Sequence, residues 1–424
     1  MALPLNATPV FLLLLVTLWA VIALYYFSAI NGFFGQFGAA LDSLTLLDST
    51  PFQFLNTNGT YPRIDSQLRA VLIFGWVFAG NGSNPEASLT GFFYLGNWGV
   101  SWFLVVMETL RSGNKHKLIA LYEHFLGISI DSILLTRMIS NSDSILGVLV
   151  FNWAHPVIMP IYLSLHLLTS PTASLPTRSN VVIDSTDLLA LPLSFVIAYT
   201  MPITLLSVPP SAFGMVFKQN IMAWYQQWNL YIGLTHFMLA FTLRRLLSSS
   251  QRDSAGNLSP RSIHKEASTK YLRLLHTTYI FVFVMGSIPY LTTMTISCTA
   301  SMWPSIFAPS VASSLTLANI LIPPNPFSGR QSVDLIQGAV WIIRWENALV
   351  SLIMGVWALA LHRRARCNQG SKVEWNEIIG IVGRLVGYTL VGGPSGVAVG
   401  LMWERDCFLL NADEAEAENM IRLE

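Results

Sequence analysis

The sequence has little charge for its size. Only 11% of its 424 residues are Asp, Glu, Lys or Arg, whereas 53% are hydrophobic; soluble domains carry about 25% charged residues. The three cysteines, Cys298, Cys367 and Cys407, stand at unrelated spacings that predict neither a metal site nor a disulfide framework. A net charge of +1, with no basic patch among aromatic residues, gives no indication of nucleic-acid binding. The composition is typical of a membrane protein.

Several catalytic motifs are also missing. The sequence contains no GxxxxGK[ST] phosphate loop, no GxGxxG dinucleotide motif, no HExxH zinc motif and no GxSxG nucleophile elbow. It also lacks an aspartate-rich DDxxD cluster that would hold magnesium diphosphate. We therefore expect neither a metal nor a cofactor, and the absences disfavour hydride, phosphoryl and metal chemistry.

Long apolar runs predict an all-α fold, a polytopic transmembrane bundle. A run of 18 or more apolar residues crosses a hydrocarbon core of about 30 Å. We expect about nine spans (eight are possible) and a cytoplasmic N-terminus. The predicted spans cover residues 9–30, 89–110, 118–139, 145–168, 188–208, 221–243, 274–296, 335–361 and 378–403.

The spans divide the chain into four parts. Residues 1–30 hold the first span, and residues 31–88 form a luminal connection with the sequons at Asn58 and Asn81. Its apolar piece, 68–80, is too short to span and is predicted to be re-entrant or interfacial. Residues 89–403 form the bundle, with a cytoplasmic loop at 244–273, and 404–424 form an acidic tail.

Charge distribution favours this orientation. The loops 111–117, 169–186, 244–273 and 362–377 hold fifteen Lys and Arg residues, against four on the opposite side. Basic residues concentrate in cytoplasmic loops. We expect an integral protein of the endoplasmic reticulum membrane, with the lipid bilayer as its surroundings.

The stretch YLGNWGVSWFLVVMETLRSGN, residues 94–114, ends an apolar run in charged residues. Glu108 and Arg111 lie three apart and therefore share a helix face. Ionisable groups that deep in an apolar segment indicate function by default. A structural ion pair at the helix end is the alternative interpretation, and the sequence leaves both open.

Further polar and aromatic residues interrupt the predicted spans. Arg344 and Glu346 stand mid-span in WIIRWENAL, where a charge needs a partner or water. The remaining candidates are the carboxylates Glu123 and Asp131, the imidazoles His155 and His166, and the stripe Trp224, Trp228 and Tyr231. Lone histidines and aromatic stripes are more often packing than ligand sites, and this interpretation also stays open.

These residue types suit carbocation chemistry in a dry cavity. A carboxylic acid in low dielectric stays protonated at neutral pH and acts as a general acid toward an epoxide or alkene. Aromatic faces stabilise the resulting cation, and a cavity within the bilayer excludes the water that would quench it. The same residues would equally suit the pore of a carrier for a lipophilic metabolite, or a non-catalytic scaffold.

Four short islands carry a family resemblance. METLRSGN (107–114), PIYLSLHLLTSPT (160–172), YTMP (199–202) and GPSGVAVGLMWERD (393–406) stand in the order found in fungal integral-membrane terpene cyclases of the ascofuranone and ascochlorin type, which the chain resembles. The resemblance implies cyclisation of an epoxide-bearing farnesylated aromatic polyketide, started by protonation and without diphosphate loss. By motif position it carries over Glu108, Arg111, Asn114, His166, Glu404, Arg405 and Asp406.

We therefore predict a metal-independent terpene cyclase of meroterpenoid biosynthesis that binds a lipophilic prenylated substrate. The alternative is a transporter or exporter of a lipophilic metabolite. The predicted catalytic acids are Glu108 and Glu346. The predicted substrate-binding residues are Arg111, Asn114, His166, Trp224, Trp228 and Arg344.

Overall fold

The computed structural model describes residues 7–43, 45–47, 50–52, 60–80, 84–114, 154–254, 260–368 and 375–423. Within these residues the chain is helical, with two isolated β-bridges and no strand, which confirms the all-α class. The predicted span 118–139, with Glu123 and Asp131, lies outside the described residues. So do the first part of span 145–168 and the sequons at Asn58 and Asn81.

Helix α5 (Pro85–Thr109) forms the centre of the bundle. Asn84 caps its start by accepting a hydrogen bond from the Ala87 amide at 2.9 Å, and Pro85 occupies the first turn, where its missing N–H costs nothing. The helix packs against α17 (Pro260–Met302), α20 (Leu335–Asn368), α21 (Trp375–Leu423) and α12 (Ser185–Phe195). Its apolar window is 83% buried, against 33–56% for the other candidate spans, because neighbours surround it.

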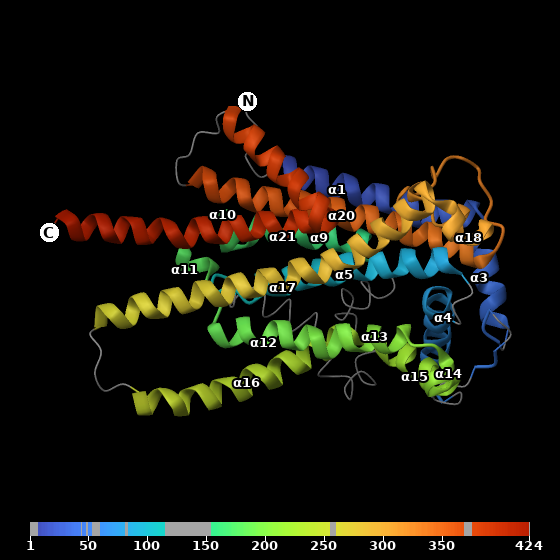
Figure 1. Ribbon diagram of the computed structural model, residues 1–424, viewed down its shortest axis with the longest axis horizontal. Helices are drawn as coiled ribbons and strands as arrows, with labels where there is room; N and C mark the ends of the chain where they lie inside the picture. The colour runs from blue at the N-terminus through green and yellow to red at the C-terminus, as the bar shows by residue number, and fades with distance from the viewer. Residues whose placement is uncertain are drawn as a thin grey trace.

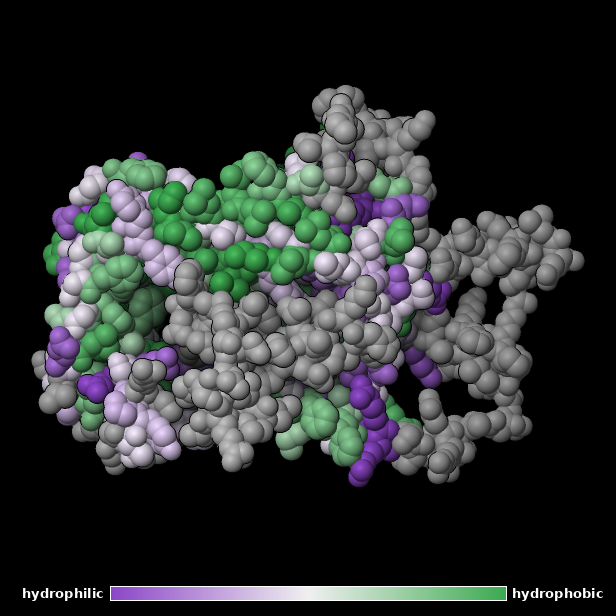
Figure 2. Space-filling view, turned by 180° about the vertical axis from the view of Figure 1, so that it is seen from behind, coloured by the Kyte–Doolittle hydropathy of each residue, from purple (hydrophilic) through white to green (hydrophobic). Residues whose placement is uncertain are grey.

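Six helical segments of the described chain are long and apolar enough to cross a membrane. They are Ala7–Ile30, Pro85–Thr109, Ser185–Ser207, Thr269–Met302, Leu335–Asn368 and Ile379–Leu410. Their axes run roughly side by side in Figure 1, and Figure 2 shows a broad hydrophobic area across the middle of one face. Exposed leucines and Phe11 on the first segment add to this apolar exterior. The helices are those of a membrane protein, but the count of nine spans is not confirmed.

The first and third of these segments each contain a π-helical turn. The first consists of α1 (Ala7–Val21), η1 (Ile22–Tyr26) and α2 (Phe27–Ile30). The third consists of α12, η2 (Val196–Thr200) and α13 (Met201–Ser207). In η2 the widened turn directly precedes Pro202, which has no N–H to continue the helical pattern.

Shorter helices cover the end of the bundle at which α5 begins. Helix α4 (Pro62–Ala79) includes most of the apolar piece 68–80 and lies across the direction of the long helices, beside α15 (Met215–Tyr225) and α14 (Pro210–Phe213) (Figure 1). It is not among the six candidate spans. Helix α3 (Phe33–Asp42), η3 (Pro304–Ile306), α18 (Pro309–Ser314) and α19 (Leu317–Leu321) belong to the connections here.

The predicted span 221–243 is interrupted. Helix α15 ends at Tyr225 and α16 (Trp228–Ser254) begins three residues later, so the polar pair Gln226–Gln227 forms a turn. The turn changes the relative directions of the residues before and after it, although the rings of Trp224 and Tyr231 still stack across it.

Helix α21 reverses direction at Gly393, whose φ of 68° and ψ of −171° break the helix before Pro394. The two halves fold against each other: the Tyr388 hydroxyl donates to Glu404 at 2.7 Å, and a Cβ added to Gly400 would meet the Tyr388 ring at 2.4 Å. The tip at Gly393 contacts Tyr290, about midway along the apolar part of α17. The predicted span 378–403 is therefore a hairpin whose ends lie toward the same end of the bundle (Figure 1).

Candidate active site

A short loop after α5 places the charged end of METLRSGN. The Ser112 and Gly113 amides donate to the carbonyls of Val182 and Asn180, each at 2.9 Å, next to α11 (Arg178–Val181). Arg111 and Ile183 form the antiparallel bridge at the centre of this pairing. The pairing turns the Arg111 side chain inward, where its Nη1 donates to the Val181 carbonyl at 2.6 Å.

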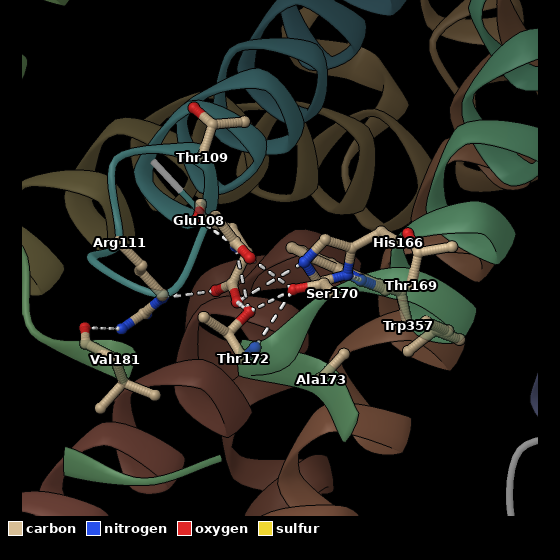
Figure 3. A network of polar contacts seen from close by, with 12 residues as sticks. Glu108, Thr109, Arg111, His166, Thr169, Ser170, Thr172, Ala173, Val181 and Trp357 are labelled. Atoms are coloured by element: carbon tan, nitrogen blue, oxygen red, sulfur yellow. Dashed lines mark hydrogen bonds and ion pairs between the residues drawn. The ribbon is translucent and has the colours of Figure 1, made fainter. Parts of the chain in front are cut away.

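Glu108, on the last turn of α5, accepts hydrogen bonds from several directions (Figure 3). Arg111 Nε donates to Oε2 at 2.6 Å and Thr172 Oγ1 donates to Oε1 at 2.6 Å. Arg405 reaches Oε2 with Nη2 at 2.8 Å and Oε1 with Nη1 at 3.4 Å. Only 2% of Glu108 is exposed, so protein donors occupy both of its oxygens.

Asp406 closes the cluster on the other side of the arginines. It accepts from Arg111 Nη2 at 2.7 Å, from Arg405 Nε at 3.1 Å and from the Tyr279 hydroxyl at 2.6 Å. Two buried carboxylates thus face two buried guanidinium groups, and the charges balance. Burying ionic groups costs least when each charge has a partner and its hydrogen bonds are filled. We call Glu108, Arg111, Arg405 and Asp406 the four-charge cluster.

Asn114 and His166 complete the surroundings of Glu108. Asn114 Nδ2 donates to the Glu108 carbonyl at 2.8 Å, and Ser170 at the start of α10 (Pro171–Ser174) donates to Asn114 Oδ1 at 2.5 Å. His166, in α9 (His155–Thr169), places Nε2 3.7 Å from Glu108 Oε1 and accepts from Trp357 Nε1 at 3.2 Å. The resemblance-derived residues Glu108, Arg111, Asn114, His166, Arg405 and Asp406 therefore gather in one place.

A cavity of ≈ 300 Å³ lies elsewhere, near the middle of α5. Its lining comes from α4, α5, α9, α13, α15, α16 and α20, and Glu108 is not part of it. The lining residues are Phe74, Gly75, Phe78, Ala79, Gly91, Tyr94, Leu95, Trp98, Ala154, His155, Leu206, Met222, Tyr225, Gln226, Trp228, Asn229, Ile343 and Glu346. Ligand sites are typically concave, mostly apolar and equipped with a few polar groups.

Glu346 is the carboxylic acid in this lining. It projects from α20, is 9% exposed, and has the Tyr94 hydroxyl of α5 as its hydrogen-bonding partner. Among the residues that the structure describes, no guanidinium group lines the cavity beside it. A single acid with one phenol partner in an aromatic enclosure is chemically suited to donate a proton to a ligand.

The cavity wall is a connected set of aromatic rings. Tyr94 stacks on Trp98 with centroids 5.5 Å apart, and Trp98 meets Trp228 edge-on at 5.0 Å. Trp228 in turn contacts Tyr199 at 4.8 Å, and Tyr199 contacts Tyr225 at 6.0 Å. Tyr94, Trp98, Tyr225 and Trp228 line the cavity, and Tyr199 packs against Tyr225 and Trp228 from outside the lining.

Two of the predicted substrate-binding residues lie away from both places. Trp224 is 59% exposed and stacks on Tyr231 at 6.1 Å, across the turn at Gln226–Gln227 and outside the cavity that Trp228 lines. Arg344 forms an ion pair with Glu86 at the start of α5 and does not line the cavity. Residues two apart on a helix do not face each other, which explains why Arg344 and Glu346 point to different surroundings.

The sequence predictions did not include some residues of the cavity. Tyr94 and Trp98 stand in the opening run YLGNWGV four residues apart, a spacing that indicates one helix face. His155 is among the candidates from the sequence but not among the predicted site residues, and Asn229 has no comparable signal. The place of both in the cavity depends on where α9 and α16 begin. Across the described part of the chain, no three His, Cys, Asp or Glu side chains form a group that would hold a metal ion.

A central helix, a membrane-type apolar exterior and an acid in an aromatic cavity define a candidate membrane-embedded enzyme. The chain belongs to the CtvD domain family, whose model matches residues 8–136 and 134–410. This match confirms the resemblance to fungal membrane terpene cyclases.

Curated relatives are terpene cyclases from fungi. Terpene cyclase ascI of Acremonium egyptiacum is 26% identical over 84% of this chain and 80% of its own length. Terpene cyclase ctvD of Aspergillus terreus is 24% identical over 95% of this chain and 100% of its own length. Terpene cyclase atmA of Aspergillus flavus is 23% identical over 94% and 96%. These relatives support a cyclase and give no support to the transporter alternative. No solved structure matches the chain.

Proposed function

We propose that the protein is a terpene cyclase that protonates the epoxide of a prenylated, farnesyl-type arene or polyketide within the membrane. The single observation that carries this proposal is the position of Glu346, a carboxylic acid inside an aromatic cavity to which three of the candidate spans, those of α5, α13 and α20, contribute. The relatives support terpene cyclisation as the reaction class. The cavity supports Glu346 as the acid and the cavity itself as the place where the substrate binds.

The first step transfers a proton from the Glu346 carboxyl group to the epoxide oxygen. The C–O bond then opens, and the alkenes of the prenyl chain attack the resulting cation in turn, forming C–C bonds. Loss of one proton from the last cation restores the proton count, so substrate and product are isomers. Tyr94 hydrogen-bonds Glu346 and positions its carboxyl group.

The aromatic rings have a role of their own in this scheme. Trp98 and Trp228 line the space that the folded prenyl chain occupies. Each ring face stabilises a nearby cation by about 0.5–2 kcal/mol. A cavity from which the bound substrate displaces water would also favour ring closure over capture of the cation by water.

Glu346 is a better acid candidate than Glu108 in this proposal. Arg111 and Arg405 bind the Glu108 oxygens, and paired guanidinium groups favour a carboxylate over a carboxylic acid. Glu108 is also absent from the cavity lining. We assign Glu108, Arg111, Asn114 and His166 the task of fixing α5, α9 and α21 to one another.

The direct test incubates microsomes that contain the protein with an epoxyfarnesyl arene. We expect the epoxide to be converted to a product of the same mass with new rings. The analogue that has an alkene in place of the epoxide should be recovered unreacted. Unchanged epoxide with a panel of hydroxylated and carboxylated arenes would contradict it. Uptake of unchanged ligand into sealed vesicles would instead indicate transport. The predicted luminal sequons support the endoplasmic reticulum as the membrane, which fluorescence microscopy of a tagged chain tests.

A further inference from the structure

The cavity contains polar atoms that the acid–base step does not use. Trp98 Nε1, Asn229 Oδ1 and both ring nitrogens of His155 are buried and have no hydrogen-bonding partner among the described residues. All three side chains line the same cavity as Glu346. Buried polar atoms are nearly always hydrogen-bonded in folded proteins, so several unpaired polar atoms on one cavity wall indicate a surface that binds polar groups of a ligand.

His155 is the most enclosed of the three, with 4% exposure. Its ring meets the Trp98 ring edge-on at 6.2 Å and the Trp102 ring at 5.6 Å. His155 is also the first residue of α9, and the positive end of a helix dipole disfavours a second positive charge there. A neutral imidazole has one N–H donor and one acceptor nitrogen, and both are available here.

The chemistry of the orphan atoms specifies their ligand. The Trp98 indole only donates, and Asn229 Oδ1 only accepts. His155 does both. A ligand that satisfies this set needs hydroxyl hydrogens to donate and oxygen lone pairs to accept, which a hydroxylated ring has and a prenyl chain lacks.

Resting on the proposed cyclase function, we propose that His155, Trp98 and Asn229 bind the oxygen-bearing ring of the substrate through a free hydroxyl group. His155 is then a positioning and specificity residue, not a proton donor. It anchors the polar end of the substrate, so that the apolar remainder lies along the aromatic wall toward Glu346. An isoprenoid epoxide without a hydroxylated ring would leave these atoms unpaired and would react poorly.

The test compares two substrates, an epoxyfarnesyl arene with a free ring hydroxyl and its O-methyl ether. For the wild-type chain we expect kcat/KM to be at least about tenfold higher for the hydroxyl compound, because sites built to bind a hydroxyl group reject analogues that lack it. In His155→Phe the preference should fall toward unity, mainly through a higher KM for the hydroxyl substrate. The preference is a ratio within one preparation, so it does not depend on how much enzyme folds.

The matched control comes from α5. Trp98 and Trp102 are one helical turn apart, and neither indole nitrogen has a partner within the described part of the chain. Of the two, Trp98 lines the cavity and Trp102 does not. Trp98→Phe should lower the preference, whereas Trp102→Phe should leave it unchanged. Equal preferences in wild type and His155→Phe, or a wild-type preference near unity, would overturn the inference while the cyclase function stands.

A binding measurement separates this inference from the reaction. The unreactive alkene analogues, one with a free hydroxyl and one O-methylated, are added to detergent-solubilised protein and the Tm is recorded. In the wild type the hydroxyl compound should raise the Tm more than the ether does. In His155→Phe the two compounds should raise the Tm by the same amount. If the wild type shows this difference in Tm but converts no epoxide, the proposed function is contradicted and the hydroxyl site is not. Equal Tm shifts with the two compounds in the wild type would contradict the hydroxyl site.

Discussion

Arg405 binds both carboxylate oxygens of Glu108, from terminal nitrogens 2.8 and 3.4 Å away, although 297 residues separate them in the chain. The contact joins the end of α5 to the second half of α21. His166 of α9 lies beside the same carboxylate, so the four-charge cluster and His166 fix α5, α9 and α21 relative to one another. Eleven residues along α9 from His166, about 16 Å at helical rise, His155 lines the cavity.

Removing one charge from this cluster should destabilise the fold. Glu108→Gln leaves two buried guanidinium groups facing a single carboxylate, and breaking a buried ion pair costs about 3–5 kcal/mol. We expect a large decrease in Tm in detergent, measured by differential scanning fluorimetry. The comparison is Arg384→Gln, which removes one of several partners of Glu404; the Arg384 side chain is 43% exposed, so the change should cost under about 1 kcal/mol. Similar effects for both variants would show that the cluster has no special structural role.

Gly393 should tolerate no side chain. Its φ of 68° lies in a region that L residues rarely adopt, and an added Cβ would meet the Tyr290 ring at 2.7 Å. Backbone strain of this kind costs about 1–3 kcal/mol. Gly393→Ala should therefore lower the Tm, whereas Gly387→Ala, with open space around its Cβ in the same hairpin, should not. An unchanged Tm in Gly393→Ala would contradict the hairpin tip.

The hairpin makes a prediction about topology. Both arms of α21 begin and end toward one end of the bundle, so the chain after Leu410 should lie on the same membrane side as Asn368. A cysteine at Asn368 and a C-terminal tag in sealed microsomes should both be accessible from the cytosol to a membrane-impermeant reagent or protease. Opposite accessibility would show that residues 379–410 cross the membrane once.

Contacts between residues close in the sequence were predictable, whereas contacts between distant residues were not. The contact between Glu108 and Arg111 followed from their spacing of three, because it lies within one turn of local structure. Their contacts with Arg405 and Asp406 depend on the reversal at Gly393. The family resemblance indicated Arg405 and Asp406 as site residues, but their spacing in the sequence does not predict a contact with Glu108.

The break between α15 and α16 changes which residues of the predicted aromatic stripe line the cavity. Trp224 and Trp228 would share a face on one unbroken helix, and the turn between α15 and α16 instead places only Trp228 in the cavity. Arg344 and Glu346 are two residues apart and thus diverge, one toward Glu86 and the other toward the cavity. The cavity itself depends on how seven helices pack, which local patterns do not encode.

The same two tryptophans give a matched test of the aromatic wall. Trp228→Leu removes a ring that lines the cavity, and a loss of about 0.5–2 kcal/mol of cation stabilisation lowers kcat by roughly 2- to 30-fold. Trp224→Leu changes an exposed ring of the same type and should leave kcat unchanged. Equal effects of the two substitutions on kcat would contradict a role of the cavity-lining aromatic rings in stabilising the cation.

The most direct test of the central claim measures epoxide conversion by Glu346→Gln. Glutamine keeps the shape and hydrogen-bonding capacity near Tyr94 but has no acidic proton. We expect kcat to fall by at least about 100-fold, the typical contribution of a general acid. The solubilised variant should keep the wild-type Tm, and Glu346→Asp should retain part of the activity. Wild-type turnover by folded Glu346→Gln would contradict the assignment of Glu346 as the acid.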